Sequence, residues 1–240
     1  MAAWRVATVV ETVPETVHAV TIRLEVPDWP GHIAGQHLDL RLTAEDGYSA
    51  QRSYSIASAP DGERIDLDVV RLDDGEVSPY LTTDLEAGDL VEVRGPLGGY
   101  FTWEPADPRP TLLVGGGSGV VPLLAMLRHH AALDRPSGMH LVYSARTAGD
   151  VLHRDELAAL ASGPRAVTVT LTRDAGAAPP FRRGRVDRTV LAEVGWPADA
   201  APRCFVCGPT PFVEAVAEAL VGLGHAPADV RTERFGPTGG

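Results

Sequence analysis

The chain has 240 residues, of which 44% are hydrophobic and 22% are charged, and its formal net charge is −11. This length suits one large or two ordinary domains, and the hydrophobic fraction is enough for a buried core. The acidic balance argues against a nucleic acid or an anionic membrane surface as the main partner.

The N-terminal residues do not predict export or membrane insertion. Residues 1–6 lack the charged and apolar regions of a signal peptide. No apolar run reaches the roughly 18 to 20 residues that a membrane-spanning helix needs. We therefore expect a cytoplasmic protein.

The first hundred residues consist of short β-branched runs separated by turn residues, with little helical periodicity. This pattern predicts a small antiparallel barrel, interrupted by one short helix at Ser78–Thr83. The predicted strands are residues 5–11, 18–26, 37–42, 52–57, 65–71 and 90–95.

A proline-rich stretch at residues 104–110 marks a change of character, and we place a domain boundary there, giving domains 1–106 and 107–240. Beyond it strands and helices alternate, which predicts a parallel, doubly wound α/β sheet. The predicted strands are residues 111–114, 140–144, 167–172, 204–206 and 230–232. The predicted helices are residues 120–130, 154–161, 186–193 and 211–223.

A glycine loop follows the first of these strands, in the run LLVGGGSGVVP at residues 112–122. Glycines let the backbone approach a phosphate, and the N–H groups at a helix start attract an anion. Gly117 and Ser118 are the predicted contacts. Pro122 stands where a G-x-G-x-x-G loop has its third glycine, and the Lys-Ser/Thr of a P-loop is missing, which disfavours a kinase. A tight turn with a purely structural role stays open.

The second strand of this half ends at Ser144 and is followed by Arg146, with no carboxylate in that run. A carboxylate there usually binds the ribose 2′-hydroxyl of NAD, whereas an arginine accommodates the 2′-phosphate of NADP. Arg173, after the third strand, could join Arg146. We therefore favour NADP(H) over NAD(H), with solvated surface arginines as the alternative.

The histidines and cysteines do not predict a metal site. Adjacent helical histidines face different directions, and His153 is expected to cap or solvate the following helix. The basic run at residues 182–185 is expected to be a solvated loop. Cys204 and Cys207 are the only cysteines, too few for a four-cysteine cluster, and strand residues three apart point to opposite faces. A dithiol switch is therefore not expected.

The run Arg52-Ser53-Tyr54-Ser55 resembles the R-x-Y-S motif of the ferredoxin–NADP reductase superfamily, and the resemblance extends across the whole chain. In that superfamily a six-stranded antiparallel barrel binds the flavin and the following α/β domain binds the nicotinamide nucleotide. The resemblance implies that Arg52 pairs with the flavin pyrophosphate, Tyr54 stacks on the isoalloxazine ring and Ser55 hydrogen-bonds near N5. These roles suit a forked guanidinium and a flat ring. Strand alternation puts Arg52 and Tyr54 on one face and points Ser53 away.

A second segment, residues 68–81, is similar to the superfamily's other flavin-binding stretch. Ser78 is expected to be a helix N-cap that presents backbone N–H groups to the pyrophosphate, which implies FAD rather than FMN. The other residues of this segment that the resemblance assigns to the cofactor are Val69, Val70, Arg71, Gly75 and Val77.

Two C-terminal segments complete the resemblance. The run Cys207-Gly208-Pro209 is similar to the segment beside the nicotinamide, and Glu233-Arg234-Phe235 is similar to an acidic-x-aromatic ending whose ring covers the flavin. The cofactors carry the chemistry of such a site, and the protein positions them. The residues that the resemblance places around the hydride path are Ser55, Cys207, Glu233 and Phe235.

The resemblance implies a flavin-dependent reductase that moves a hydride from NAD(P)H to FAD. Because the chain lacks the cysteines of an iron–sulfur cluster, we expect the electrons to pass to a separate protein, such as a ferredoxin, a monooxygenase or another redox enzyme. Two alternatives stay open. One is a regulatory subunit that binds FAD or a nucleotide without hydride transfer, and the other is a reductase of diffusible flavin.

Overall fold

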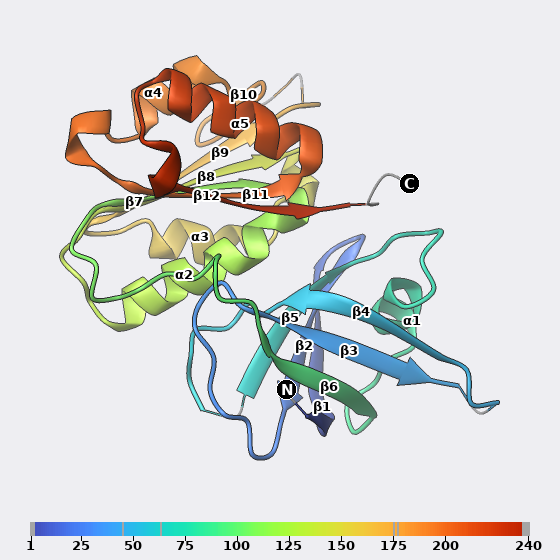
Figure 1. The fold of residues 1–240 in the computed structure, drawn as a ribbon. Helices are drawn as coiled ribbons and strands as arrows, with labels where there is room; N and C mark the ends of the chain where they lie inside the picture. The colour runs from blue at the N-terminus through green and yellow to red at the C-terminus, as the bar shows by residue number, and fades with distance from the viewer. Residues whose placement is uncertain (1–2, 45, 63, 175, 177, 237–240) are drawn as a thin grey trace.

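The structure, a computed structural model, describes residues 3–236 except 45, 63, 175 and 177 (Figure 1). Two six-stranded sheets follow one another along this part of the chain, the first antiparallel and the second parallel. Within it, no helix is long and apolar enough to cross a membrane.

The first sheet has the strand order β4-β3-β6-β1-β2-β5, and all its paired neighbours are antiparallel. A bridge between Ile56, just after β4, and Leu67 of β5 joins the two outer strands. Alternate side chains fill the interior, so the predicted barrel is confirmed. Its elements are β1 (Trp4–Thr16), β2 (Ala19–Glu25), β3 (His37–Thr43), β4 (Ser49–Ser55), β5 (Arg64–Val70), α1 (Ser78–Thr83) and β6 (Leu90–Leu97).

Strand β1 is longer than the sequence predicted, continuing past residue 11 to Thr16. Its register against β2 shifts between Val9 and Glu11 and again between Pro14 and Thr16. Such β-bulges interrupt the alternation that sequence patterns rely on, and they re-aim side chains. The second one lies at Glu15, where β1 approaches the other half of the molecule.

The second sheet has the order β10-β9-β8-β7-β11-β12. Helices α2 and α3 cover one face and α4 and α5 the other, which confirms the doubly wound sheet (Figure 1). Its strands are β7 (Thr111–Gly116), β8 (Met139–Ala145), β9 (Arg165–Leu171), β10 (Arg182–Arg183), β11 (Arg203–Pro209) and β12 (Val230–Phe235). Its helices are α2 (Val120–Ala132), α3 (Arg154–Leu160), α4 (Arg188–Val194) and α5 (Thr210–Gly222).

Strand β10 corrects the expectation of a solvated loop at residues 182–185. It pairs in parallel with Thr170 and Leu171 of β9, and the Arg182 guanidinium forms two hydrogen bonds with the Glu193 carboxylate. Two residues are too few to show the alternation of apolar and polar side chains that predicts a strand, so the sequence pattern could not reveal this edge strand.

The two halves pack through helix α2, which faces the barrel (Figure 1). Ala19, Ala34 and Ala57 of the barrel belong to the same apolar cluster as the buried side of α2. In the connection between the sheets, Trp103 donates its backbone N–H to Ala34 and packs its ring against His129. This contact fixes the barrel against one face of the parallel sheet.

Candidate functional site

The candidate site lies where the strand order of the parallel sheet reverses. Strand β7 has β8 on one side and β11 on the other, so the chain moves away from β7 in both directions. Ligands of such sheets bind outside the carboxyl ends of the strands at this switch point. The glycine loop follows β7 there, and residues 207–209 end β11 beside it.

The glycine loop packs closely against the end of β11. A Cβ on Gly119 would lie 2.6 Å from the backbone nitrogen of Gly208 and would overlap the carbonyl of Cys207. Gly117 has a positive φ of 56°, which an L side chain rarely adopts. The loop therefore needs glycine for packing and for its turn, and its exposed centre at Gly117 and Ser118 stays open to a ligand.

A cavity of about 400 Å³ lies between this edge of the sheet and the barrel. From the barrel it is lined by Thr16, His18, Ala19 and Val70. From the α/β half it is lined by Gly116, Gly117, Ser118, Tyr143, Ser144, Ala145, Arg146, Asp150, Leu152, Thr172, Pro209 and Phe212. Both halves of the chain thus contribute to one cavity.

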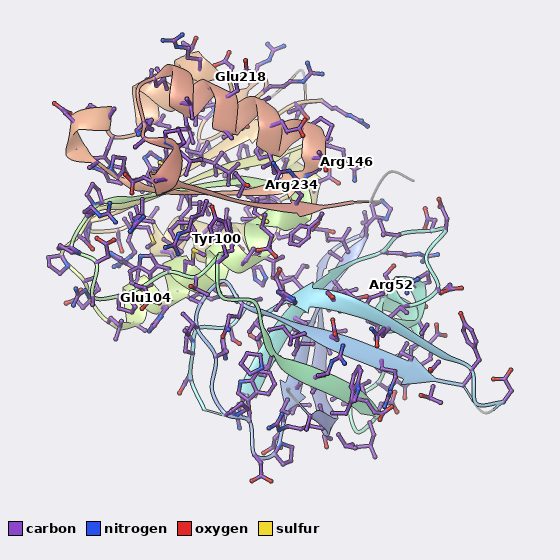
Figure 2. The ribbon with its side chains drawn as sticks, in the orientation of Figure 1. Arg52, Tyr100, Glu104, Arg146, Glu218 and Arg234 are labelled. Carbon is purple, nitrogen blue, oxygen red and sulfur yellow. The ribbon has the colours of Figure 1, made fainter. Side chains whose placement is uncertain are left out.

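Six of the predicted cofactor contacts line this cavity: Val70, Gly117, Ser118, Ser144, Arg146 and Pro209. The Arg173 side chain is exposed, and its backbone N–H donates to the Arg146 carbonyl, so the loops after β8 and β9 adjoin. Figure 2 shows Arg146 and Arg234 at the edge of the parallel sheet and Arg52 on the barrel, on the same side of the molecule.

Asp150 is a cavity residue that the sequence reasoning missed. Its carboxylate accepts hydrogen bonds from the Thr147 N–H and hydroxyl, at 3.0 and 2.7 Å, and lies 3.6 Å from the Arg146 guanidinium. The carboxylate lies four residues beyond Arg146, outside the run at the strand end that the sequence reasoning considered. The spacing Thr147-x-x-Asp150 of a capping box was the available signal.

The R-x-Y-S run forms the end of β4. Tyr54 pairs with Leu38 and Arg52 with Leu40, so both lie on one face, whereas the Ser53 hydroxyl donates to Asp39 on the other face at 2.6 Å. Ser53 therefore cannot offer its side chain to a ligand held by its two neighbours. The Arg52 guanidinium lies 3.1 Å from the Glu76 carboxylate, and burial raises the pKa of Tyr54 to about 12.

The second predicted flavin segment differs from the expectation at Ser78. The N-cap of α1 is Val77, and the Ser78 hydroxyl instead accepts a hydrogen bond from the Leu72 N–H at 3.0 Å, because the preceding turn folds back onto the helix start. The side chains of Val69 and Val77 are buried in the barrel core, so only their backbone could meet a ligand.

Gly75 and Arg71 flank that turn. A Cβ on Gly75 would lie 3.0 Å from the Ser78 hydroxyl, so a larger residue would crowd the turn. Arg71 is exposed, and its guanidinium lies 3.1 Å from the Asp73 carboxylate. The Arg71 side chain thus reaches toward solvent next to the segment rather than into the barrel.

The four residues assigned to the hydride path come from three strands. Cys207 pairs with Glu233, and Pro209 with Phe235, between β11 and β12. Cys207 packs in the cluster with α2, whereas Cys204 packs on the opposite face of the sheet, as predicted. Burial raises the pKa of the Cys207 thiol well above its usual range, so it is a neutral packing group and not a thiolate.

Ser55 and Glu233 each carry a buried oxygen with no hydrogen-bond partner among the described residues, Oγ and Oε2 respectively. Burial also raises the pKa of Glu233 to about 7. Neither residue lines the cavity described above. Buried polar atoms in proteins are almost always paired, so these two oxygens are free to accept or donate a hydrogen bond to a bound group. The residues present fit a flavin on the barrel side and a nicotinamide nucleotide on the sheet side. The described part of the chain holds no cluster of three or more potential metal ligands.

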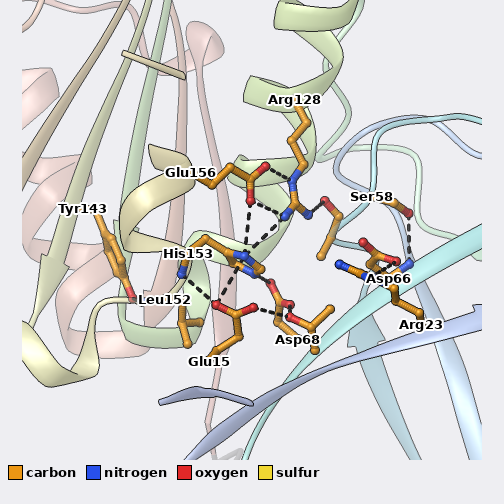
Figure 3. A network of polar contacts seen from close by, with 12 residues as sticks. Glu15, Arg23, Ser58, Asp66, Asp68, Arg128, Tyr143, Leu152, His153 and Glu156 are labelled. Atoms are coloured by element: carbon orange, nitrogen blue, oxygen red, sulfur yellow. Dashed lines mark hydrogen bonds and ion pairs between the residues drawn. The ribbon is translucent and has the colours of Figure 1, made fainter. Parts of the chain in front are cut away.

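His153 corrects another expectation. It precedes α3 with a left-handed φ of 50°, but its side chain neither caps the helix nor faces solvent. Only 7% of the side chain is exposed, and the ring lies among the carboxylates of Glu15, Asp68 and Glu156 (Figure 3). Two of these three come from the barrel, a long-range arrangement that no local pattern encodes.

Comparisons with known proteins match both halves of the chain. Residues 7–102 match the oxidoreductase FAD-binding domain, and residues 113–218 match the oxidoreductase NAD-binding domain. A ferredoxin–NADP reductase B of Sorangium cellulosum is 39% identical over 210 residues, which cover 84% of each chain. The electron transfer component of a 2-halobenzoate 1,2-dioxygenase from Burkholderia cepacia is 32% identical over 87% of this chain, which spans 60% of that protein's length.

A solved structure has a similar fold over nearly the whole chain. The FAD/NAD-binding domain of a nitric oxide dioxygenase from Vibrio cholerae superposes with a TM-score of 0.87 at 28% identity. The match covers 97% of this chain and 99% of that one. The order of the two sheets and their packing are therefore shared.

Proposed function

The chain belongs to the ferredoxin–NADP reductase superfamily of oxidoreductases with paired FAD-binding and NAD-binding domains, and on that premise we propose that it is a flavin-dependent reductase. It moves a hydride from NAD(P)H to FAD and delivers the electrons to a separate redox protein. The observation that carries the proposal is the interdomain cavity at the carboxyl edge of the parallel sheet, which the glycine loop, Arg146 and the barrel line together. The domains that we propose are residues 1–106 and 107–240, of which residues 1–2 and 237–240 lie outside the described part.

The barrel residues are suited to hold FAD. We assign the pyrophosphate to Arg52, whose guanidinium is exposed and must exchange its Glu76 partner for phosphate oxygens. Tyr54, anchored against the barrel core, offers its ring for stacking, and the unpaired Ser55 hydroxyl supplies a hydrogen bond. When bound, FAD would accept a hydride and release the two electrons one at a time, which suits single-electron acceptors.

The sheet residues are suited to hold the nicotinamide nucleotide. Gly117 and Ser118 line the cavity just before α2, and backbone N–H groups at a helix start favour a phosphate. We propose NADP(H) as the preferred donor because Arg146 lines the cavity and Arg173 adjoins it. The Asp150 carboxylate competes for Arg146 at 3.6 Å, so this preference depends on whether a 2′-phosphate displaces it.

Cys207, Glu233 and Phe235 shape the nicotinamide end of the site. Cys207 is fully buried and fills space beside the glycine loop. The half-buried ring of Phe235 lies at the end of β12, where we assign it to cover the flavin face that the nicotinamide approaches. These side chains set distance and exclude water, which is how a protein contributes to hydride transfer between two cofactors.

The proposed acceptor is a separate protein. This proposal draws support from relatives named as a ferredoxin–NADP reductase and as a dioxygenase electron transfer component. We also place the protein in the cytoplasm, supported by the free thiols of Cys204 and Cys207.

Anaerobic reduction tests the proposal directly. The purified protein should be yellow, and its flavin absorbance should bleach on addition of NADPH, and more slowly with NADH. A flavin that stays oxidised with both donors would favour the regulatory subunit instead. Loss of FAD on purification together with tight binding of added riboflavin would favour the reductase of diffusible flavin.

Substitutions at Tyr54 and Phe235 test the two sides of the site. Tyr54→Ala should lose most of the flavin, whereas Tyr54→Phe, which keeps the ring, should retain it. Phe235→Ala should retain flavin and change the relative rates with NADPH and NADH. Full flavin retention in Tyr54→Ala would remove Tyr54 from the stacking role.

A further inference from the structure

A buried polar network joins the two halves of the molecule beside the cavity (Figure 3). The His153 Nε2 donates to the Asp68 carboxylate of β5 at 2.9 Å. The His153 backbone N–H donates to the Glu15 carboxylate of β1 at 3.2 Å, and Nδ1 lies 3.4 Å from the same carboxylate and 3.3 Å from Glu156 of α3. One residue of the α/β half therefore holds two strands of the barrel.

Arg128 of α2 adds a second link between the halves. Its guanidinium donates to both Glu156 oxygens, at 2.7 and 2.6 Å, and to the Ala57 carbonyl of the barrel at 2.7 Å. On the barrel side, the Thr21 hydroxyl lies 2.7 Å from Asp68 and 3.1 Å from Glu15. The Thr21 hydroxyl therefore helps to orient both carboxylates toward His153.

The carboxylates around His153 favour a protonated imidazole. Glu15, Asp68 and Glu156 face His153 from β1, β5 and α3, and Arg128 of α2 supplies one positive charge. Burial alone would lower the pKa of His153, but its hydrogen bonds to Asp68 and Glu156 outweigh that effect and raise the pKa to about 9. His153 is therefore charged at neutral pH, and its ion pairs are shielded, since the Asp68 side chain is 0% exposed.

The network lies directly behind both walls of the cavity. On the α/β side, Leu152 precedes His153 and lines the cavity, and the Tyr143 hydroxyl accepts from the Leu152 N–H and donates to the Asp150 carbonyl. On the barrel side, Thr16 follows Glu15 and also lines the cavity. A movement of His153 away from the barrel would therefore displace the loop at residues 146–152 relative to the barrel.

We propose that His153 is a positioning residue, which fixes the nucleotide-contacting loop at residues 146–152 against the barrel through Asp68 and Glu15. The inference rests on the proposed function, because the loop matters for hydride transfer only if a nucleotide binds there. Hydride transfer is sensitive to such placement, since an error of about 1 Å can cost on the order of 100-fold in rate. The apolar contacts of Ala19, Ala34 and Ala57 keep the halves packed when the network is broken.

The test substitutes His153→Gln, with His140→Gln as the matched control. His140 is a half-buried histidine of strand β8 whose ring bonds Thr168 of β9. Amide hydrogen exchange of the flavin-free protein should show residues 146–152 exchanging at least about 10-fold faster in His153→Gln, with barrel amides unchanged. Anaerobic stopped-flow should show the limiting rate of flavin reduction by NADPH falling at least about 10-fold, with FAD content and reduction by dithionite unchanged.

Two further measurements separate positioning from a general loss of folding. The limiting rate of the unaltered protein should fall as pH rises through about 9, where His153 loses its charge, and this step should be absent in His153→Gln. Asp68→Asn should reproduce the effects of His153→Gln, and the double variant should be no worse than either single one. Should His153→Gln fail to fold, Asp68→Asn carries the same measurements.

The results separate this inference from the proposed function. Normal exchange at residues 146–152 and a normal reduction rate in His153→Gln, or equal effects in His140→Gln, would overturn the positioning role. A protein that NADPH and NADH both fail to reduce would overturn the proposed function. Faster exchange of the loop in His153→Gln would still establish the link between the halves in that case.

Discussion

The buried carboxylate of Glu233, a predicted site residue, is expected to lower the stability of the flavin-free protein when it is ionised, and this can be tested. Its carboxylate lies on β12, has a buried Oε2 with no partner in the described part of the chain, and has a pKa raised to about 7 by burial. We predict that the change in the free energy of unfolding caused by Glu233→Gln in the flavin-free protein is more favourable at alkaline pH than at acidic pH.

The magnitude follows from the two pKa values. The pKa rises from an ordinary 4.5 to about 7, and each unit is worth about 1.4 kcal/mol, so the full penalty is roughly 3 to 4 kcal/mol. The folded protein prefers the protonated acid, whereas the unfolded chain ionises above its ordinary pKa. Stability is therefore lost as pH rises from 4.5 through 7, and the loss is complete above that range. Because the side chain is only half-buried, we expect about 1 to 3 kcal/mol.

The pH dependence, and not the absolute value, is what identifies the cause. A glutamine at this position would itself bury an unpaired amide, which costs roughly 1 to 2 kcal/mol at every pH. Urea unfolding of both proteins at pH 5 and pH 8.5 removes this constant cost by difference. Glu193→Gln, at an exposed carboxylate on α4, is the matched control and should show no such dependence. A difference between Glu233→Gln and the parent that is equal at both pH values would refute the reasoning.

Other predictions concern packing and the linker. Gly119→Ala should cost about 1 to 3 kcal/mol and weaken nucleotide binding because its Cβ meets the backbone of β11, whereas Gly99→Ala, with no atom within 4 Å, should be silent in urea unfolding. Phe205→Ala, which removes a buried ring that contacts Phe101 edge to face, should cost about 3 to 5 kcal/mol in the same assay. Asp107→Asn should cost about 1 kcal/mol by breaking part-buried ion pairs to two arginines. Because those arginines lower the pKa of Asp107, that cost should shrink in acid.

Periodicity was sufficient for the architecture. The barrel and the doubly wound sheet each depend on many residues that repeat the same alternation, so individual exceptions do not matter. The opposite orientation of Cys204 and Cys207 followed from strand geometry alone. The glycine loop meets residues 207–209 because the parallel strands β7 and β11 end at one edge of the sheet, whereas the sequence placed residues 207–209 beside the nicotinamide by resemblance alone.

The missed features depend on which residues the fold brings into contact. The Ser78 hydroxyl bonds a turn instead of capping its helix, and the extension of β1 needs two bulges that pairing with β2 supports. His153 is 85 residues from Asp68 in sequence, so its setting is decided by how the halves pack. Local propensity carries no information about such partners, and the error at His153 lies at the junction of the two domains.

The site is split between two domains, so its geometry depends on how the two domains pack against each other. Neither the barrel nor the sheet alone fixes the distance between Ser55 and Glu233, because they belong to different halves. The distance depends on the contact surface, where small apolar side chains allow sliding and the directional bonds of His153 and Arg128 oppose it. A buried ion pair contributes little net stability but is sensitive to geometry. We therefore assign these buried ion pairs the role of fixing one relative placement of the two domains, and not that of raising the stability of the fold.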